Sequence, residues 1–183
     1  RTDRALALRE RIRDQIDDPR LDQRVALCRV VEPRAHVHPV AAFLGAASVG
    51  ATWAVCNPDL AVDGVIARLG QLEPTVLVAS DGSVYGGKRI DRTKELAQIR
   101  EQLPTLKATV LVSRLGDQAP PGDVTPWSKV LDLDAPLEIT PVPFAHPLWV
   151  LFSSGTTGTP KGIVHGHGGV VLEHLKYLSL HAD

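Results

Sequence analysis

The sequence predicts an α/β fold with a mostly parallel β-sheet covered by helices. Two features carry this prediction. Short, continuous apolar runs rich in β-branched residues are typical of strands buried on both faces. These runs alternate with segments whose apolar residues recur at helical spacing. Such alternation is typical of α/β proteins, in which helices connect neighbouring parallel strands. The 183 residues are enough for one domain.

The first two thirds of the chain supply four predicted strands and four predicted helices. The strands, each a short apolar run, are residues 24–28, 51–56, 75–79 and 108–112. The helices, each with apolar residues at helical period, are residues 6–16, 40–49, 62–72 and 91–103. Gly50 is placed to cap the end of the second of these helices, and Asp91 to cap the beginning of the fourth.

Residues 119–147 are predicted to be a mostly irregular connector. Half of the 14 prolines fall there, and proline fixes φ and removes a hydrogen-bond donor. A short helical turn is still expected within residues 127–133. We interpret the segment as a link that delivers the chain to its next strand, so residues 1–183 are expected to belong to a single domain.

The last part of the chain places a polar loop between two predicted strands. Residues 148–152 and 162–165 are the predicted strands, and a helix over 170–180 follows, preceded by Gly168 and Gly169. The loop reads Ser-Ser-Gly-Thr-Thr-Gly-Thr-Pro-Lys-Gly over 153–162. Its glycines allow positive φ, successive backbone N–H groups and hydroxyls can surround an anion, and Lys161 adds a positive charge. These properties predict a site for a polyphosphate.

Three alternative interpretations apply to this loop. The P-loop of NTPases has Gly directly before its Lys and Ser or Thr directly after it, whereas here Pro160 precedes Lys161 and Gly162 follows. The dinucleotide-binding fingerprint fails as well, because the glycine spacing is not G-x-G-x-x-G. A flexible Ser/Thr/Gly hairpin tip without a ligand stays open.

The loop resembles the phosphate loop of the adenylate-forming superfamily, which includes acyl-CoA synthetases. The resemblance implies the large N-terminal domain of that fold. It also implies that a carboxylate attacks the α-phosphorus of ATP to give an acyl-adenylate, from which coenzyme A displaces AMP, with Mg²⁺ as a cofactor. The residues that the resemblance assigns to the ATP phosphates are Ser153, Ser154, Gly155, Thr156, Thr157, Gly158, Thr159 and Lys161.

The stretch from His165 to Lys176 resembles the acetoacetyl-CoA synthetase group, as do the segments 53–59 and 81–92. The implied function is that of an acetoacetate–CoA ligase acting on acetoacetate, ATP and coenzyme A. Another short-chain acyl-CoA synthetase, for acetate or propionate, remains an alternative. So do a non-catalytic nucleotide-binding module and a remnant without function.

Two further sets of residues invite a functional interpretation. In related acetyl-CoA synthetases, a basic glycine-containing segment contacts the nucleotide end of coenzyme A, and the resemblance carries that role to Gly86, Gly87 and Lys88. A solvated basic turn is the alternative. His165 and His167 could form a metal pair, but no third ligand is evident from the sequence. We therefore predict no metal site within the chain, with His165 ending a strand and His167 opening a helix.

Composition and charge limit which partners and which cellular compartment are expected for the protein. The formal net charge of −1 gives no reason to expect a nucleic-acid or anionic-membrane partner, and no segment is long and apolar enough to span a bilayer. Cys28 and Cys56 each end an apolar run and are expected to be reduced, buried thiols in the cytoplasm. The oligomeric state is not predicted.

The ends of the chain and one internal segment depart from the family pattern. The chain begins at Arg1 and contains no Met, so we expect it to be a piece of a longer protein. The resemblance implies a C-terminal domain with a catalytic lysine, neither of which these residues include. We therefore expect the isolated chain not to turn over. Residues 29–39 are longer and more basic than the corresponding link in the family.

Overall fold

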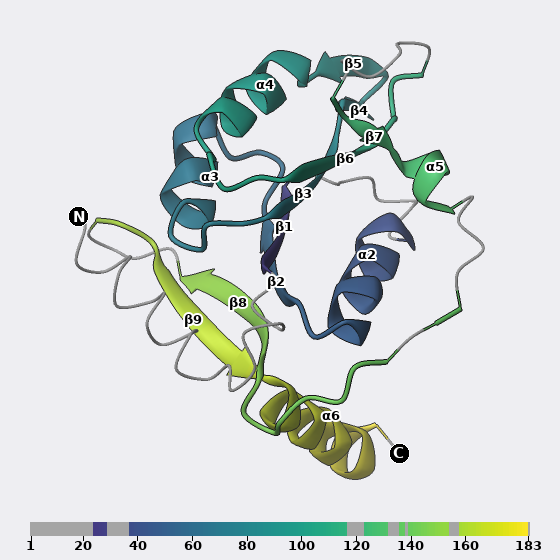
Figure 1. Ribbon diagram of the computed structural model, residues 1–183, viewed down its shortest axis with the longest axis vertical. Coiled ribbons are helices and arrows are strands. Elements are labelled where there is room, and N and C mark those ends of the chain that lie inside the picture. The colour runs from purple at the N-terminus through teal and green to yellow at the C-terminus, as the bar shows by residue number, and fades with distance from the viewer. Residues whose placement is uncertain are drawn as a thin grey trace.

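The computed structural model describes residues 24–28, 37–116, 123–131, 136–137, 139–153 and 158–182. The predicted helix over residues 6–16 lies outside these ranges, as do residues 29–36 of the unusual link. The prediction of an α/β fold is confirmed, because a central sheet is flanked by helices (Figure 1). Within the described part of the chain, no helix is long and apolar enough to cross a membrane.

The central sheet has seven strands in the order β7-β6-β3-β1-β2-β8-β9 among the described residues. All neighbouring pairs are parallel except β8 and β9, which are antiparallel. The four strands predicted in the first part of the chain are all present. The strands are β1 (Arg24–Cys28), β2 (Thr52–Cys56), β3 (Val76–Ser80), β6 (Ala108–Val112), β7 (Thr125–Pro126), β8 (Pro147–Ser153) and β9 (Lys161–Gly166).

Helices cover both faces of this sheet. Buried residues of α3 and α4 share a core cluster with Leu77 and Val150, whereas Ala46 of α2 joins Trp53 and Val78 in a second cluster. Two opposite sheet faces are therefore sealed by different helices, as Figure 1 shows. The helices are α2 (Val37–Ser48), α3 (Val62–Leu69), α4 (Thr93–Glu101), α5 (Trp127–Leu131) and α6 (His167–His181).

Helix α2 begins three residues earlier than predicted and ends one residue earlier. Pro39 lies in its first turn, where a missing N–H costs no helical hydrogen bond, so the helix can start at Val37. At its end Gly50 has φ 73°, and the N–H groups of Gly50 and Ala51 bond to the carbonyls of Ala47 and Ala46. This is a Schellman cap, which confirms the prediction for Gly50.

A two-stranded hairpin was missed by the sequence prediction. Strands β4 (Gly82–Tyr85) and β5 (Lys88–Asp91) pair antiparallel and are joined by Gly86 and Gly87 alone. Both glycines have positive φ, 56° and 76°, as a type I′ turn requires. The Gly-Gly pair between two short runs was the signal that could have predicted it.

The predicted N-cap at Asp91 needs a correction. Asp91 is the last residue of β5, and Arg92 occupies the N-cap position of α4. The Asp91 carboxylate nevertheless accepts hydrogen bonds from the backbone N–H (2.8 Å) and the hydroxyl (2.7 Å) of Thr93. Asp91 thus satisfies a donor at the start of the helix from one position further back.

The connector and the last helix also differ from their predicted limits. The edge strand β7 lies within residues 119–147, where little regular structure was expected, and α5 forms the predicted helical turn. Helix α6 starts at His167, so Gly168 and Gly169 lie inside its first turn instead of preceding it. The N–H groups of His167 and Gly168 bond to the carbonyls of His146 and Phe144, which supports this earlier start.

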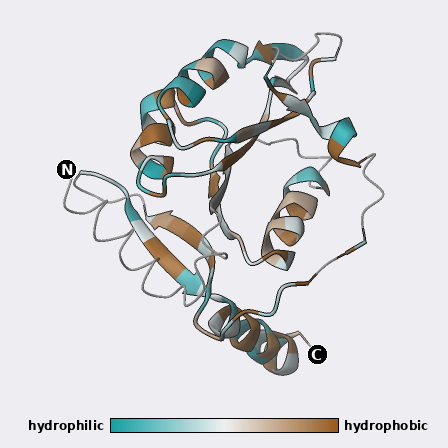
Figure 2. Ribbon diagram, in the orientation of Figure 1, coloured by the Kyte–Doolittle hydropathy of each residue, from teal (hydrophilic) through white to brown (hydrophobic). Residues whose placement is uncertain are grey.

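The pair β8 and β9 continues the sheet with one face in the core. Figure 2 shows hydrophobic residues along both strands. Leu148 and Val150 of β8 are buried, whereas Leu151 and Ile163 are exposed on the opposite face. This alternation is typical of a strand pair whose two faces differ in solvent access. The hairpin therefore rests firmly on the core at one face, and it carries the predicted polar loop at its tip.

Candidate functional site

The strands β8 and β9 hold the two ends of the predicted phosphate loop side by side. Ser153, the last residue of β8, is registered opposite Lys161, the first residue of β9. The connection between them is therefore residues 154–160. Four of the predicted phosphate-binding residues lie outside the described residues: Ser154, Gly155, Thr156 and Thr157.

The described end of the loop combines an unusual backbone with an exposed cation. Gly158 has φ 116°, which L side chains rarely adopt, and a Cβ built there would meet no atom within 4 Å. The need for glycine is therefore conformational and not steric. Thr159 is half-buried beside it, and Lys161 is exposed. A turn with backbone donors, a hydroxyl and a mobile ammonium group can bind an anion.

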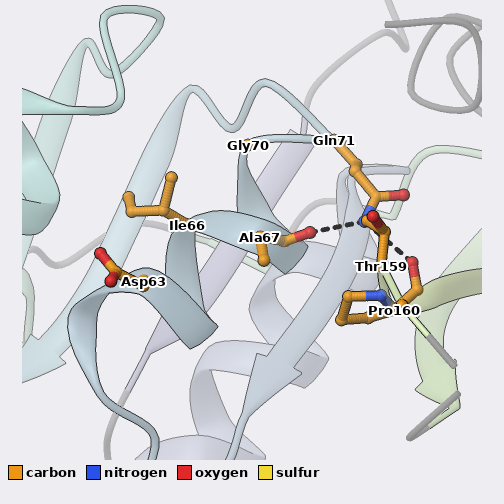
Figure 3. A pocket seen from close by; sticks show the side chains of 8 residues that line it. Asp63, Ile66, Ala67, Gly70, Gln71, Thr159 and Pro160 are labelled. Atoms are coloured by element: carbon orange, nitrogen blue, oxygen red, sulfur yellow. Dashed lines mark hydrogen bonds between the residues drawn. The ribbon is translucent and has the colours of Figure 1, made fainter. Parts of the chain in front are cut away.

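The loop exit is tied to a helix that is distant in sequence. The Gln71 side-chain amide donates to the carbonyl of Pro160 (3.0 Å) and to the carbonyl of Ala67 in α3 (2.6 Å). Figure 3 shows both hydrogen bonds, with Gln71 between the end of α3 and the loop. The residue is only 7% exposed. Sequence reasoning missed Gln71, because nothing near it in the sequence signals a contact 89 positions away.

A cavity of about 860 Å³ opens between α3 and the loop exit (Figure 3). Its lining is mostly apolar, and the one charged side chain among the described residues that line it is the acidic Asp63, which repels phosphate. The cavity is therefore unsuited to the phosphates themselves, although the loop exit forms one of its walls. It is lined by Asp63, Ile66, Ala67, Gly70, Gln71, Gly158, Thr159 and Pro160.

The predicted coenzyme A residues lie elsewhere. Gly86, Gly87 and Lys88 form the exposed tip of the β4–β5 hairpin. Arg89 of this hairpin donates to the carbonyl of Leu115 (2.5 Å), in the turn that follows β6. Strands β3, β1 and β2 stand between β6 and β8 in the sheet. The structure therefore does not bring these three residues together with the described residues of the phosphate loop (Figure 1).

The buried carboxylate of Asp81 connects that hairpin to the turn after β6 by hydrogen bonds. Asp81, at the end of β3, is 8% exposed. Its carboxylate accepts hydrogen bonds from the hydroxyl of Ser113 (3.0 Å) and from the backbone N–H groups of Arg114 (2.7 Å) and Leu115 (3.2 Å). Its carbonyl accepts from the N–H of Arg92 (2.8 Å). Asp81 thus joins the start of the hairpin, its end and the turn after β6.

The two histidines behind the loop take part in packing. His165 lies opposite Trp149 in the β8–β9 register, with ring centroids 6.3 Å apart. His167 opens α6 as predicted, 5.7 Å from the ring of the fully buried His146, whose Nε2 lies 2.8 Å from the carbonyl of Gly50. Burial, together with the neighbouring His146, lowers the pKa of His167. In the part of the chain that the structure describes, no three His, Cys, Asp or Glu side chains gather to hold a metal ion.

Cys56 is a buried free thiol, as predicted. Burial raises its pKa to about 11, more than the nearby Arg68 charge lowers it. A thiol with so high a pKa carries little thiolate at neutral pH and is chemically inert. Cys56 is therefore a core residue and not a nucleophile. The prediction for the Cys28 side chain lies outside what the structure describes.

Curated relatives of the chain are acetoacetyl-CoA synthetases. One from Danio rerio is 37% identical over 158 residues, which cover 80% of this chain and 24% of the relative. Another, from Rhizobium meliloti (strain 1021), is 42% identical over 148 residues, covering 78% of this chain and 22% of the relative. The chain thus spans about a quarter of the length of these relatives.

Solved structures give the same picture. The acetoacetyl-CoA synthetase from Streptomyces lividans matches with a TM-score of 0.82 and 41% identity, over 98% of this chain and 27% of that one. An anthranilate CoA ligase, AuaEII, matches with a TM-score of 0.69 at 22% identity, over 85% of this chain and 27% of that one, which is a likeness of fold.

The protein family described as AMP-binding enzyme matches residues 25–181. Because this match covers most of the sequence, the chain belongs to the AMP-binding enzyme family.

Proposed function

We propose that this chain is the ATP-phosphate-binding part of an acetoacetate–CoA ligase. The observation that carries the proposal is the β8–β9 pair, which closes a Ser/Thr/Gly connection between Ser153 and Lys161. The similarity to acetoacetyl-CoA synthetases supports the choice of acid. In this proposal residues 1–183 are part of the large N-terminal domain, with residues 119–147 as a connector, and the enzyme works in the cytoplasm.

The proposed chemistry begins with ATP bound at the loop. The acetoacetate carboxylate attacks the α-phosphorus, the bond to the β-phosphate oxygen breaks, and pyrophosphate leaves from acetoacetyl-adenylate. Negative charge builds up on the leaving group, so donors and a cation around the β- and γ-phosphates lower the barrier. The proposed phosphate-binding residues are Ser153, Ser154, Gly155, Thr156, Thr157, Gly158, Thr159 and Lys161.

Mg²⁺ is proposed to accompany the nucleotide. This ion prefers hard oxygen ligands and is usually held by substrate phosphates, water and one or two protein groups. Ser153 and Thr159, at the two ends of the loop, are half-buried and carry hydroxyl groups of that type, which would be available to a nucleotide-bound ion without forming a metal site of their own. When bound, the ion would neutralise part of the phosphate charge.

The second half-reaction needs coenzyme A, whose thiol attacks the acyl carbon of the adenylate and displaces AMP. For its nucleotide end we propose contacts with Gly86, Gly87 and Lys88. The exposed type I′ turn presents backbone N–H groups beside an exposed ammonium group, a combination that suits a phosphate.

Pyrophosphate exchange tests the proposal. The natural protein that contains this chain is incubated with ATP, labelled pyrophosphate and a carboxylic acid, without coenzyme A, and label entering ATP is counted. Acetoacetate is expected to support the fastest exchange. Faster exchange with acetate or propionate would assign the protein to another short-chain acid, and no exchange with any acid would overturn adenylation.

A further inference from the structure

Both the backbone and the side chain of Gln71 donate hydrogen bonds to α3. Its N–H donates to the carbonyl of Arg68 (3.1 Å), and its amide donates to the carbonyl of Ala67 (2.6 Å), both in the last turns of that helix. The preceding Gly70 has a helical backbone, and a Cβ there would overlap the Ile66 carbonyl. The position of the Gln71 side chain is therefore set before it reaches the loop.

The amide group connects two separate parts of the protein. A primary amide has two N–H donors, so it can serve the carbonyls of Ala67 and Pro160 at the same time. Because Gln71 is buried, water cannot readily replace either partner, and an amide without partners there would be costly. The bond to Pro160 thus fastens the loop exit to α3 (Figure 3).

The Pro160 carbonyl is an effective point at which to fix the chain. Proline has no N–H and a restricted φ, so the carbonyl is its only backbone hydrogen-bonding group. That carbonyl lies in one peptide plane with the nitrogen of Lys161, where β9 and its pairing with Ser153 begin. Fixing the oxygen therefore fixes the direction from which the backbone enters Lys161.

From this geometry we propose that Gln71 is a positioning residue for the phosphate loop. Its amide orients the Pro160–Lys161 peptide, and through it the Lys161 ammonium group and the turn at Gly158. The inference rests on the proposed function of the loop. A purely structural role, in which Gln71 only completes the end of α3 through Ala67, is the competing explanation.

The test compares two variants of the natural protein that contains this chain. Gln71→Leu removes both donors, and Gln71→Glu keeps the shape of the side chain while replacing the donors with acceptors. In pyrophosphate exchange, Gln71→Leu is expected to lower kcat/KM for ATP about tenfold, the equivalent of one lost hydrogen bond, with KM for acetoacetate within about twofold of wild type.

Gln71→Glu adds a readout that a structural role would not move. A carboxylate beside two carbonyl oxygens cannot donate, whereas the protonated acid donates one hydrogen bond again. Its defect in kcat/KM is therefore expected to shrink, relative to wild type, as the pH falls from about 8 to about 6. This variant also keeps the proposal testable if Gln71→Leu fails to fold.

Thr105→Val is the matched control. The Thr105 hydroxyl donates to another proline carbonyl, that of Pro74 (2.8 Å), which is not part of the loop. Its loss is expected to lower Tm as Gln71→Leu does but to leave kcat/KM for ATP unchanged. Equal kcat/KM for wild type, Gln71→Leu and Gln71→Glu, with only Tm reduced, would overturn the positioning role. Absence of exchange in the wild type would instead overturn the proposed function.

Discussion

Two glycine-containing turns, each next to a lysine, are built in different ways. Gly86 and Gly87 close the β4–β5 hairpin, whose four residue pairs are in register up to the turn itself. Gly158 lies at the exit of a longer connection between β8 and β9, and its φ of 116° is further from ordinary backbone than either hairpin glycine. The hairpin tip is exposed, whereas Pro160 at the loop exit is bonded to Gln71.

The difference shows which turn is determined locally. The hairpin turn follows from its own two residues and from the strands that adjoin them. The loop exit is bonded to Gln71, which follows α3 and lies 89 positions earlier in the sequence. A turn that depends on a distant anchor can be adjusted independently of its own sequence, which would suit the phosphate-binding role proposed for this loop.

The largest expected effect tests whether Lys161 neutralises charge on the leaving pyrophosphate, as proposed. Lys161→Ala is expected to lower kcat/KM for ATP in pyrophosphate exchange about a hundredfold, because the leaving pyrophosphate loses a cation in the transition state. Folding should persist, since Lys161 is exposed. Lys176→Ala, which removes an exposed lysine paired with Glu173 on α6, is the control and should exchange normally. An unfolded Lys161→Ala protein would argue against a loop role.

The next largest effect compares a glycine with positive φ in the loop, Gly158, with one outside it, Gly116. Gly158→Ala should lower kcat/KM for ATP about tenfold, because an L residue at φ 116° costs on the order of 1–3 kcal/mol or shifts the loop. Gly116 also has positive φ, 69°, and open space around its Cβ position, in the turn that follows β6. Gly116→Ala is expected to lower the free energy of unfolding by ~1 kcal/mol without affecting exchange. Equal losses of exchange in both variants would contradict the comparison.

A smaller effect tests whether the β4–β5 turn binds coenzyme A. Lys88→Ala is expected to raise KM for coenzyme A about threefold to fivefold, because an exposed ion pair with a phosphate contributes roughly 0.2–1 kcal/mol. Pyrophosphate exchange involves no coenzyme A, so its rate is the internal control. An unchanged KM for coenzyme A would leave the tip as a solvated basic turn. A change in exchange would mean that the two turns are coupled.

The sequence predicted the repeating elements better than their junctions. The strands β1, β2, β3, β6 and β8 follow from short continuous apolar runs, which are typical of strands in a parallel sheet covered by helices. The Schellman cap at Gly50 also follows from local rules. The early start of α6 does not, because the carbonyls of Phe144 and His146 that support it come from another part of the chain.

The candidate site shows the same limit. The residues of the loop could be read directly, since their chemistry is contiguous in sequence. The anchor at Gln71 could not, because a glutamine after a helix has no local feature that indicates a bond to Pro160. The β4–β5 hairpin was predictable from its Gly-Gly pair. Its strands are mostly exposed and lack the continuous apolar runs that indicate the strands of the central sheet.

The smallest expected effect is a pH dependence confined to the loop side of the molecule. Burial, and then the adjacent His146, lower the pKa of His167 below its ordinary value of 6.5. The unfolded chain therefore binds this proton more readily, so the stability contributed by neutral His167 is present above about pH 6.5 and is lost as the pH falls below it. In hydrogen exchange, the protection factors at the start of α6 should be lower at pH 5.5 than at pH 7.5, while those of the β4–β5 hairpin should not change.

Two variants serve as controls for this effect. His167→Gln should reduce the difference in protection, whereas His181→Gln, at the exposed end of α6, should not. Equal loosening of both regions would mean that acid acts on the whole fold and not through His167.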